Sequence, residues 1–188
     1  YTRASDLLLL AENNLTVNSG ATITNSGAGG ISLVAGWDGA STSTPAVTNG
    51  TGTVTINASV ATGGQISVLG GNGATFAGGT VSVNGAYNPG TGTTTVGGGG
   101  TLNLNTGSTV TLPSLTLNSN SGVLGGSDNI TIGSGGTLTW SAGTISGTGT
   151  LTTQSGSTTT MGGGGSANQI LSRTWNNSGS VSFTPNSG

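Results

Sequence analysis

The sequence contains no cysteine, no histidine and no lysine among its 188 residues. Zinc sites are built largely from Cys and His, and a disulfide needs two Cys, so neither feature is expected. Nucleic-acid affinity depends on several Lys or Arg contacts to phosphates, whereas the only basic residues are Arg3 and Arg173. We therefore expect no metal, no cofactor and no nucleic-acid partner.

Charge of either sign is scarce, at 3% of residues with a net charge of -2. The acids are Asp6, Glu12, Asp38 and Asp128, which are widely separated in the sequence. General acid–base catalysis needs a titratable side chain with a tuned pKa. The β-helical enzymes that cleave polysaccharides generally use clusters of Asp with Lys, Arg or His. We therefore expect no catalytic residue and no enzymatic activity.

Long apolar runs are also missing. No stretch reaches the about 18 apolar residues of a transmembrane helix, so we expect no membrane insertion. The run LLLL at 7–10 follows Asp6 and lacks a basic flank, so we interpret it as a buried first strand rather than the tail of a signal sequence. Because the chain starts at Tyr1, we expect it to be processed or an excerpt of something longer.

Glycine is abundant, with 39 residues, and Thr, Ser and Asn supply most of the rest. Each interior glycine costs a helix about 1 kcal/mol relative to alanine, so long helices are not expected. Disorder is also disfavoured, because disordered chains are usually charged and poor in β-branched residues. The composition favours short β-strands joined by glycine-rich turns.

The main pattern is a triad of apolar, small polar and apolar residues. Alternation with period two is typical of a strand with one buried and one exposed face. Runs such as GGGG at 97–100 and 162–165 separate the triads and predict turns. The triads lie at 15–17, 54–56, 66–68, 81–83, 102–104, 110–112, 115–117, 130–132, 138–140 and 181–183.

The triads form a recurrent unit without a strict period. Many follow a glycine, and the intervals between these glycines, at positions 52, 64, 79, 100, 136 and 149, are unequal. Such units favour a solenoid, in which each repeat buries its apolar face against the next. A β-sandwich is the alternative, but it usually has longer strands and more aromatics than the seven found here.

We therefore predict an all-β, parallel β-helix (β-solenoid) segment over residues 1–188. With roughly 20 residues per rung, the chain would make about nine rungs stacked at about 4.8 Å. The residues Trp37, Asp38, Gly39 and Pro45 indicate that segment 37–50 is an irregular loop that leaves the rod. The glycine run at 97–100 indicates an irregular corner or seam.

Residues 6–36, DLLLLAENNLTVNSGATITNSGAGGISLVAG, resemble repeats of the filamentous haemagglutinin family, which are exoproteins exported by two-partner secretion. Residues 136–161 are similar to the Gly/Thr repeats of giant bacterial surface proteins. The resemblance implies a right-handed parallel β-helix, export across the outer membrane, and a role in adhesion or matrix building. The family's secretion-recognition domain is not evident. The matching residues are Leu9, Ala11, Leu15, Val17, Gly20, Ala21, Ile23, Ile31, Leu33, Ala35 and Gly36.

Threonine alternates along several predicted strands. Flat Thr arrays on β-helices can bind ice if the threonines lie in register on every rung. The uneven spacing of the units predicts that they do not, so we attribute these threonines to high β propensity. The Thr-x-Thr motifs start at Thr22, Thr53, Thr109 and Thr137.

A few other residues are candidates for ligand or sugar contacts. Trp37, Tyr87 and Trp175 could stack on sugars, the first two from predicted loops, whereas Trp140 is expected to fill the core. Gly125-Gly126-Ser127-Asp128 approximates a calcium repeat poorly and is interpreted as a turn. In a chain this rich in Asn, Ser and Thr, we expect none of the Asn-x-Ser/Thr sites to be used. These are Asn14, Asn49, Asn57, Asn129 and Asn176.

The sequence thus favours a structural or adhesive rod segment of a secreted or cell-surface bacterial exoprotein. The expected partners are neighbouring repeats of the same chain or further copies of it, and a host or matrix surface. The main alternative is an extracellular filament subunit that stacks end to end through open strand edges. An ice-binding or carbohydrate-active β-helix is less favoured.

Overall fold

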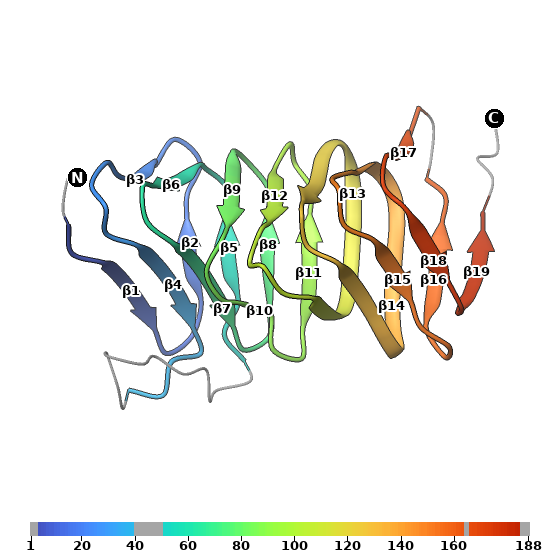
Figure 1. The fold of residues 1–188 in the computed structure, drawn as a ribbon, viewed down its shortest axis with the longest axis horizontal. Coiled ribbons are helices and arrows are strands. Elements are labelled where there is room, and N and C mark those ends of the chain that lie inside the picture. Colours follow the sequence, from blue (N-terminus) through green and yellow to red (C-terminus); the bar gives the residue numbers. More distant parts are fainter. Residues whose placement is uncertain (1–3, 40–50, 164–165, 185–188) are drawn as a thin grey trace.

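The computed structural model describes residues 4–39, 51–163 and 166–184, and these residues form strands and turns without any helix. The chain coils so that most turns supply three short strands, and successive turns stack along one axis (Figure 1). All the ladders between strands are parallel in this part of the chain. The predicted parallel β-solenoid is therefore confirmed, and the β-sandwich alternative is wrong.

The strands form three faces, which we number in the order in which each turn visits them. Face 1 contains β1 (Leu7–Ala11), β4 (Ile31–Ala35), β7 (Ile66–Gly70), β10 (Tyr87–Asn88), β15 (Leu151–Thr153) and β18 (Trp175–Asn177). Face 2 contains β2 (Leu15–Val17), β5 (Val54–Ile56), β8 (Gly73–Phe76), β11 (Thr93–Val96), β16 (Thr158–Met161) and β19 (Ser180–Phe183). Face 3 contains β3 (Ile23–Asn25), β6 (Val60–Thr62), β9 (Thr80–Val83), β12 (Thr101–Leu104) and β17 (Gln169–Leu171).

Two long strands each make a whole turn and contribute to all three faces. They are β13 (Val110–Gly126) and β14 (Ile130–Ile145). Their mutual register shifts only between the segments that belong to different faces. These shifts therefore mark the corners of the coil, where the chain bends from one face to the next.

The turns differ little in length except the second. On face 2, Leu15 pairs with Val54 and Val54 pairs with Ala74, so the second turn is about twice as long as the third. The coil has about seven turns, after which β18 and β19 begin a further one, so the predicted nine rungs were wrong. The additional length of the second turn adds no rung. The later turns are nearly equal, because the same position on face 2 is occupied successively by Ala74, Thr94, Leu115, Leu138, Thr159 and Val181.

The additional length lies between β4 and β5, where a loop was predicted at 37–50. Trp37 begins this connection, and its backbone N–H donates to the Ala11 carbonyl at 2.9 Å. Residues 40–50 lie outside the described residues. At 97–100 the chain forms the corner between β11 and β12, where the Gly97 and Gly100 backbones are buried.

The core is a narrow column of inward-facing side chains. Phe76 and Trp140 are its largest members and are each 1% exposed. The indole Nε1 of Trp140 donates to the Gly143 carbonyl at 3.1 Å, which satisfies its polar atom inside the column. The predicted core position of Trp140 is confirmed.

Side-chain oxygens join successive turns at the corners, where backbone N–H groups leave the ladder. Backbone N–H groups form hydrogen bonds in folded proteins, and Asn supplies an acceptor from the neighbouring turn. Each corner is thereby tied to the next by a short polar contact. The pairs are Asn14 Oδ1 with Thr53 N at 3.0 Å, Asn105 Oδ1 with Ser127 N at 2.9 Å, and Asn129 Oδ1 with Thr150 N at 2.9 Å.

Candidate interaction surfaces

The acidic side chains are distributed among different corners. Asp6 and Glu12 flank β1, Asp38 follows β4, and Asp128 lies between β13 and β14. The Asp6 carboxylate accepts from the Gly30 backbone N–H at 2.6 Å, which is a corner contact of the kind that Asn makes elsewhere. Across the described ranges, no three His, Cys, Asp or Glu side chains are grouped so that they could hold a metal ion.

Asp128 is buried, with 5% exposure, and ties two corners together. Its Oδ2 accepts from the Thr106 backbone N–H at 2.6 Å and from the Thr106 hydroxyl at 2.8 Å. Its Oδ1 accepts from the Gly107 backbone N–H at 3.0 Å. Of the turn predicted at 125–128, Ser127 and Asp128 form a corner whose carboxylate holds the preceding corner, whereas Gly125 and Gly126 end strand β13.

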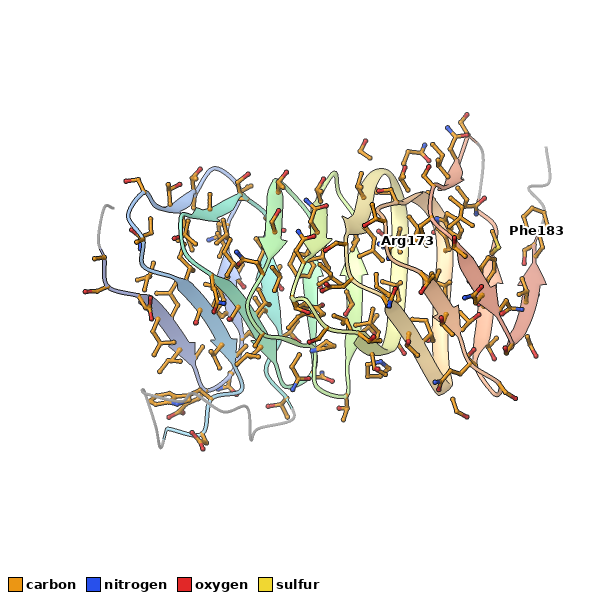
Figure 2. The ribbon with its side chains drawn as sticks, viewed as in Figure 1. Arg173 and Phe183 are labelled. Atoms are coloured by element: carbon orange, nitrogen blue, oxygen red, sulfur yellow. The ribbon has the colours of Figure 1, made fainter. Side chains whose placement is uncertain are left out.

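Arg173 is the other buried charged residue and is 8% exposed. It lies at the corner between β17 and β18 and is labelled in Figure 2. Its Nη2 donates to the Gly126 carbonyl at 2.9 Å, while Nε and Nη1 are buried without a partner. Burial lowers the pKa of the guanidinium, and the nearby Asp128 charge opposes that shift. Sequence reasoning gave Arg173 no role, because burial of a lone charge cannot be read from its neighbours in the chain.

Tyr87 lies in strand β10, so its predicted position in a loop was wrong. It belongs to β10 and packs against the core, with its ring centroid 6.2 Å from that of Phe76. Its hydroxyl shares a hydrogen bond of 2.8 Å with the hydroxyl of Thr94, which is fully buried. Burial raises the pKa of Tyr87 above its ordinary value, and the hydrogen bond to Thr94 partly offsets this.

The two remaining candidate aromatics are partly buried. Trp175, in β18, packs against the core, and its Nε1 donates to the Thr153 hydroxyl at 3.0 Å. Trp37 lies at the start of the long connection after β4. The two indoles therefore lie near opposite ends of the coil and do not form a common platform.

The Asn residues of the glycosylation sequons differ in their surroundings. The side chains of Asn14 and Asn129 are engaged in the corner contacts described above. Asn57 is half-buried, Asn176 is exposed on β18, and Asn49 lies outside the described residues. Sequence reasoning proposed none of them as a used site.

Threonines on face 2 lie in register, contrary to the expectation from their uneven spacing. The outward position in the middle of each face 2 strand pairs with the same position in the next turn. The prediction failed because register depends on the length of a whole turn, whereas the spacing of consecutive strands mixes three faces. The column consists of Thr16, Thr55, Thr75, Thr95, Thr116, Thr139, Thr160 and Ser182.

A cleft of about 460 Å³ interrupts face 1 where the β10 ladder ends. Gln65, Asn84 and Tyr87 line one side, and Thr106 and Thr111 line the other. The lining is largely amide and hydroxyl groups without a charge. It provides hydrogen-bonding atoms, and Tyr87 is the one titratable residue of this lining, with a pKa that burial raises.

The two end turns expose apolar side chains. At the C-terminal end, Phe183 is 64% exposed and Val181 is 46% exposed, and Figure 2 shows Phe183 on the last strand of the coil. At the other end, an open hollow of about 460 Å³ is lined partly by Leu9, Leu15 and Ile23. Both ends also present strands whose outer edges have no ladder partner among the described residues.

These features define the protein as a parallel β-solenoid with a thin apolar core, polar corners and apolar ends. The described residues contain no helix that is long and apolar enough to cross a membrane. No family model, no curated protein and no solved structure matches this chain.

Proposed function

We propose that this chain is a structural, adhesive rod segment of a secreted or cell-surface bacterial exoprotein. The observation that carries the proposal is the pair of apolar end turns with open strand edges. Unpaired edges are templates for further strands, and turns of a solenoid are stable when neighbouring turns cover them. The natural partners of these ends are therefore further turns of the same polypeptide.

The flanks of the rod would supply its contacts with a host or matrix surface. Five of the six charged residues are described, and each is at or near a corner rather than on an outward strand position. The faces are therefore neutral arrays of hydroxyl, amide and small apolar groups. Such surfaces favour contact through shape and hydrogen bonding, without the long-range attraction that charge would provide.

The test is the size and location of the native polypeptide. An antibody raised against the folded chain should detect, in the native source, a polypeptide many times larger than 17.8 kDa. A protease added to intact cells should remove it if it is exposed at the surface. A native species that is protected inside the cell would contradict the proposal.

A filament subunit is the second candidate, because the two ends are complementary in form. The hollow at the β1–β3 end is lined by leucines and isoleucine, and the opposite end presents Phe183. A head-to-tail contact between such ends uses two different surfaces, so it generates an open filament rather than a closed dimer. This candidate predicts a native polypeptide of about the size of this chain.

Assembly of the purified chain tests the second candidate. Wild-type protein should form rods in electron micrographs, and Val181→Lys with Phe183→Lys should keep it monomeric in sedimentation experiments. A control with Thr111→Lys and Thr131→Lys adds the same charge to outward positions of face 1 and should still assemble. Salt should change assembly weakly, because few charges are available to screen. Equal assembly of both variants would contradict stacking through the ends.

A further inference from the structure

Face 2 presents a column of threonine in seven successive turns, followed by Ser182 in the last. Each of these side chains is exposed or half-exposed. Neighbouring strands in a sheet are spaced by about 4.8 Å, so the column runs for roughly 34 Å along the axis. The register on this face continues from β2 to β19 without a bulge between paired face 2 segments, because the shifts between β13 and β14 fall at the corners.

A second column runs beside the first on the same face. It lies two positions earlier on each strand, so the two columns are about 6.6 Å apart. The hydroxyls of Thr137 and Ser114, which are neighbours in it, are 2.9 Å apart and hydrogen-bonded. From β11 to β19 every position of this column carries a hydroxyl. These residues are Thr93, Ser114, Thr137, Thr158 and Ser180.

The other faces do not repeat this arrangement, although the same β propensity acts on them. The middle outward position of face 3 changes from turn to turn and is Thr24, Ala61, Ser82, Asn103 and then Gly125. On face 1, threonine appears at this position only from β13 onwards, and Asn176 ends the column. Propensity and ladder stacking alone therefore do not account for the uniformity of face 2.

The chemistry of face 2 suits a lattice of ordered water. Each threonine offers a hydroxyl, which donates and accepts hydrogen bonds, and a methyl group, beside which water has restricted orientational freedom. Branching at Cβ and the identical neighbours above and below limit rotation of each side chain. No charged side chain occupies either column from β2 to β19 to impose a different orientation on the water.

We propose that face 2 binds ice. The ligand is the surface of an ice crystal, whose oxygen atoms repeat in two dimensions at spacings close to those of the two hydroxyl columns. The threonine hydroxyls join the water lattice and the methyl groups occupy the spaces between its oxygens. This activity uses the flank of the rod and is independent of what covers its ends.

Partition into slowly growing ice tests the proposal, with the purified chain at a concentration where it sediments as a monomer. Wild-type protein should be enriched in the ice fraction and should inhibit recrystallisation. Thr116→Tyr with Thr139→Tyr puts two bulky rings at the centre of face 2 and should reduce enrichment on the order of tenfold. The matched control, Thr111→Tyr with Thr131→Tyr, alters the same two strands on face 1 and should behave as wild type.

Circular dichroism and unfolding curves of both variants establish that each remains folded, so a loss of ice binding reports on the surface. Exclusion of folded wild-type protein from ice would overturn the proposal, and so would an equal loss in both variants. Retention on crystalline polysaccharide together with exclusion from ice would assign face 2 to a different ligand and would also overturn it. None of these outcomes depends on the native size that tests the rod function.

Discussion

Replacement of the buried Arg173 by methionine provides a sharp test of the energetics of the coil. The guanidinium is 8% exposed, donates one hydrogen bond, to Gly126, and has two nitrogen atoms buried without a partner. Methionine matches the aliphatic stem of arginine, ends near the position of Nε, and is flexible enough to fill irregular space in a core. Arg173→Met therefore removes the charge and the unpaired donors while retaining the packing of the stem.

The expected effect follows from opposing contributions. A hydrogen bond from a charged group contributes about 1.5–3 kcal/mol, and each unsatisfied buried donor costs about 1–3 kcal/mol. Desolvation of the cation costs several kcal/mol, of which attraction to Asp128 recovers part. The sum predicts that Arg173→Met is neutral or raises the free energy of unfolding by about 1–2 kcal/mol.

The opposite result is expected at Asp128. Asp128→Ala removes three hydrogen bonds to Thr106 and Gly107 and leaves the Arg173 charge without its nearby anion. The expected loss is about 3–5 kcal/mol. In the double variant the cation is absent, so the cost of Asp128→Ala should fall by about 1–2 kcal/mol, which is the coupling between the two residues.

Urea unfolding followed by tryptophan fluorescence measures these differences, provided that the slope of the transition is unchanged among the variants. If Arg173→Met lowered the free energy of unfolding by more than about 2 kcal/mol, the burial argument would be refuted. That result would mean that the guanidinium is stabilised by more than its contacts with Gly126 and Asp128. Strict additivity of the two substitutions would refute the coupling.

Three further predictions address single positions. The raised pKa of Tyr87 means that the folded state holds the neutral phenol, so stability should be full below about pH 10 and should fall as the unfolded tyrosine ionises above it. Tyr87→Phe should therefore reduce the dependence of the free energy of unfolding on pH above about pH 10. An unchanged pH dependence in this variant would contradict the assignment. A Cβ on Gly100 would lie 2.3 Å from the Phe76 carbonyl oxygen, whereas one on Gly133 would approach no atom closer than 3.8 Å. In thermal unfolding, Gly100→Ala should lower the free energy of unfolding by more than about 2 kcal/mol and Gly133→Ala by less than about 1 kcal/mol. Equal effects of the two substitutions would contradict the steric argument. The buried hydroxyl of Thr159 has no partner, so Thr159→Val should stabilise the chain by about 1 kcal/mol in urea, and a loss of that size would indicate a bound water instead.

The strands could be predicted from the sequence because alternation is a local property. All ten apolar triads lie in strands, including 54–56 in β5 and 130–132 in β14. The signal fails where an inward position is polar. In β11 and β16 the inward positions include Thr94 and Thr159, so the alternation of burial is not visible as an alternation of polarity.

The candidate surfaces depended on long-range arrangement and were harder to predict. The sequence around Tyr87 is typical of a loop, yet its ring packs beside Phe76 at the edge of the core. Pairing of Thr116 with Thr139 requires the length of a complete turn, which becomes known only when the three faces are assigned. The burial of Arg173 and Asp128 likewise arises from stacked corners that are distant from each other in the sequence.

The second turn is about twice as long as the third, yet the pairing of Leu15 with Val54 and of Val54 with Ala74 is uninterrupted. The connection between β4 and β5 therefore lengthens the polypeptide without changing the pairing of the turns on either side. A foreign peptide grafted into this connection would be displayed at a fixed height along the rod without altering the rungs on either side. Repetition of such grafts in consecutive turns would place epitopes at intervals of about 4.8 Å, so the coil would set the spacing of a multivalent display.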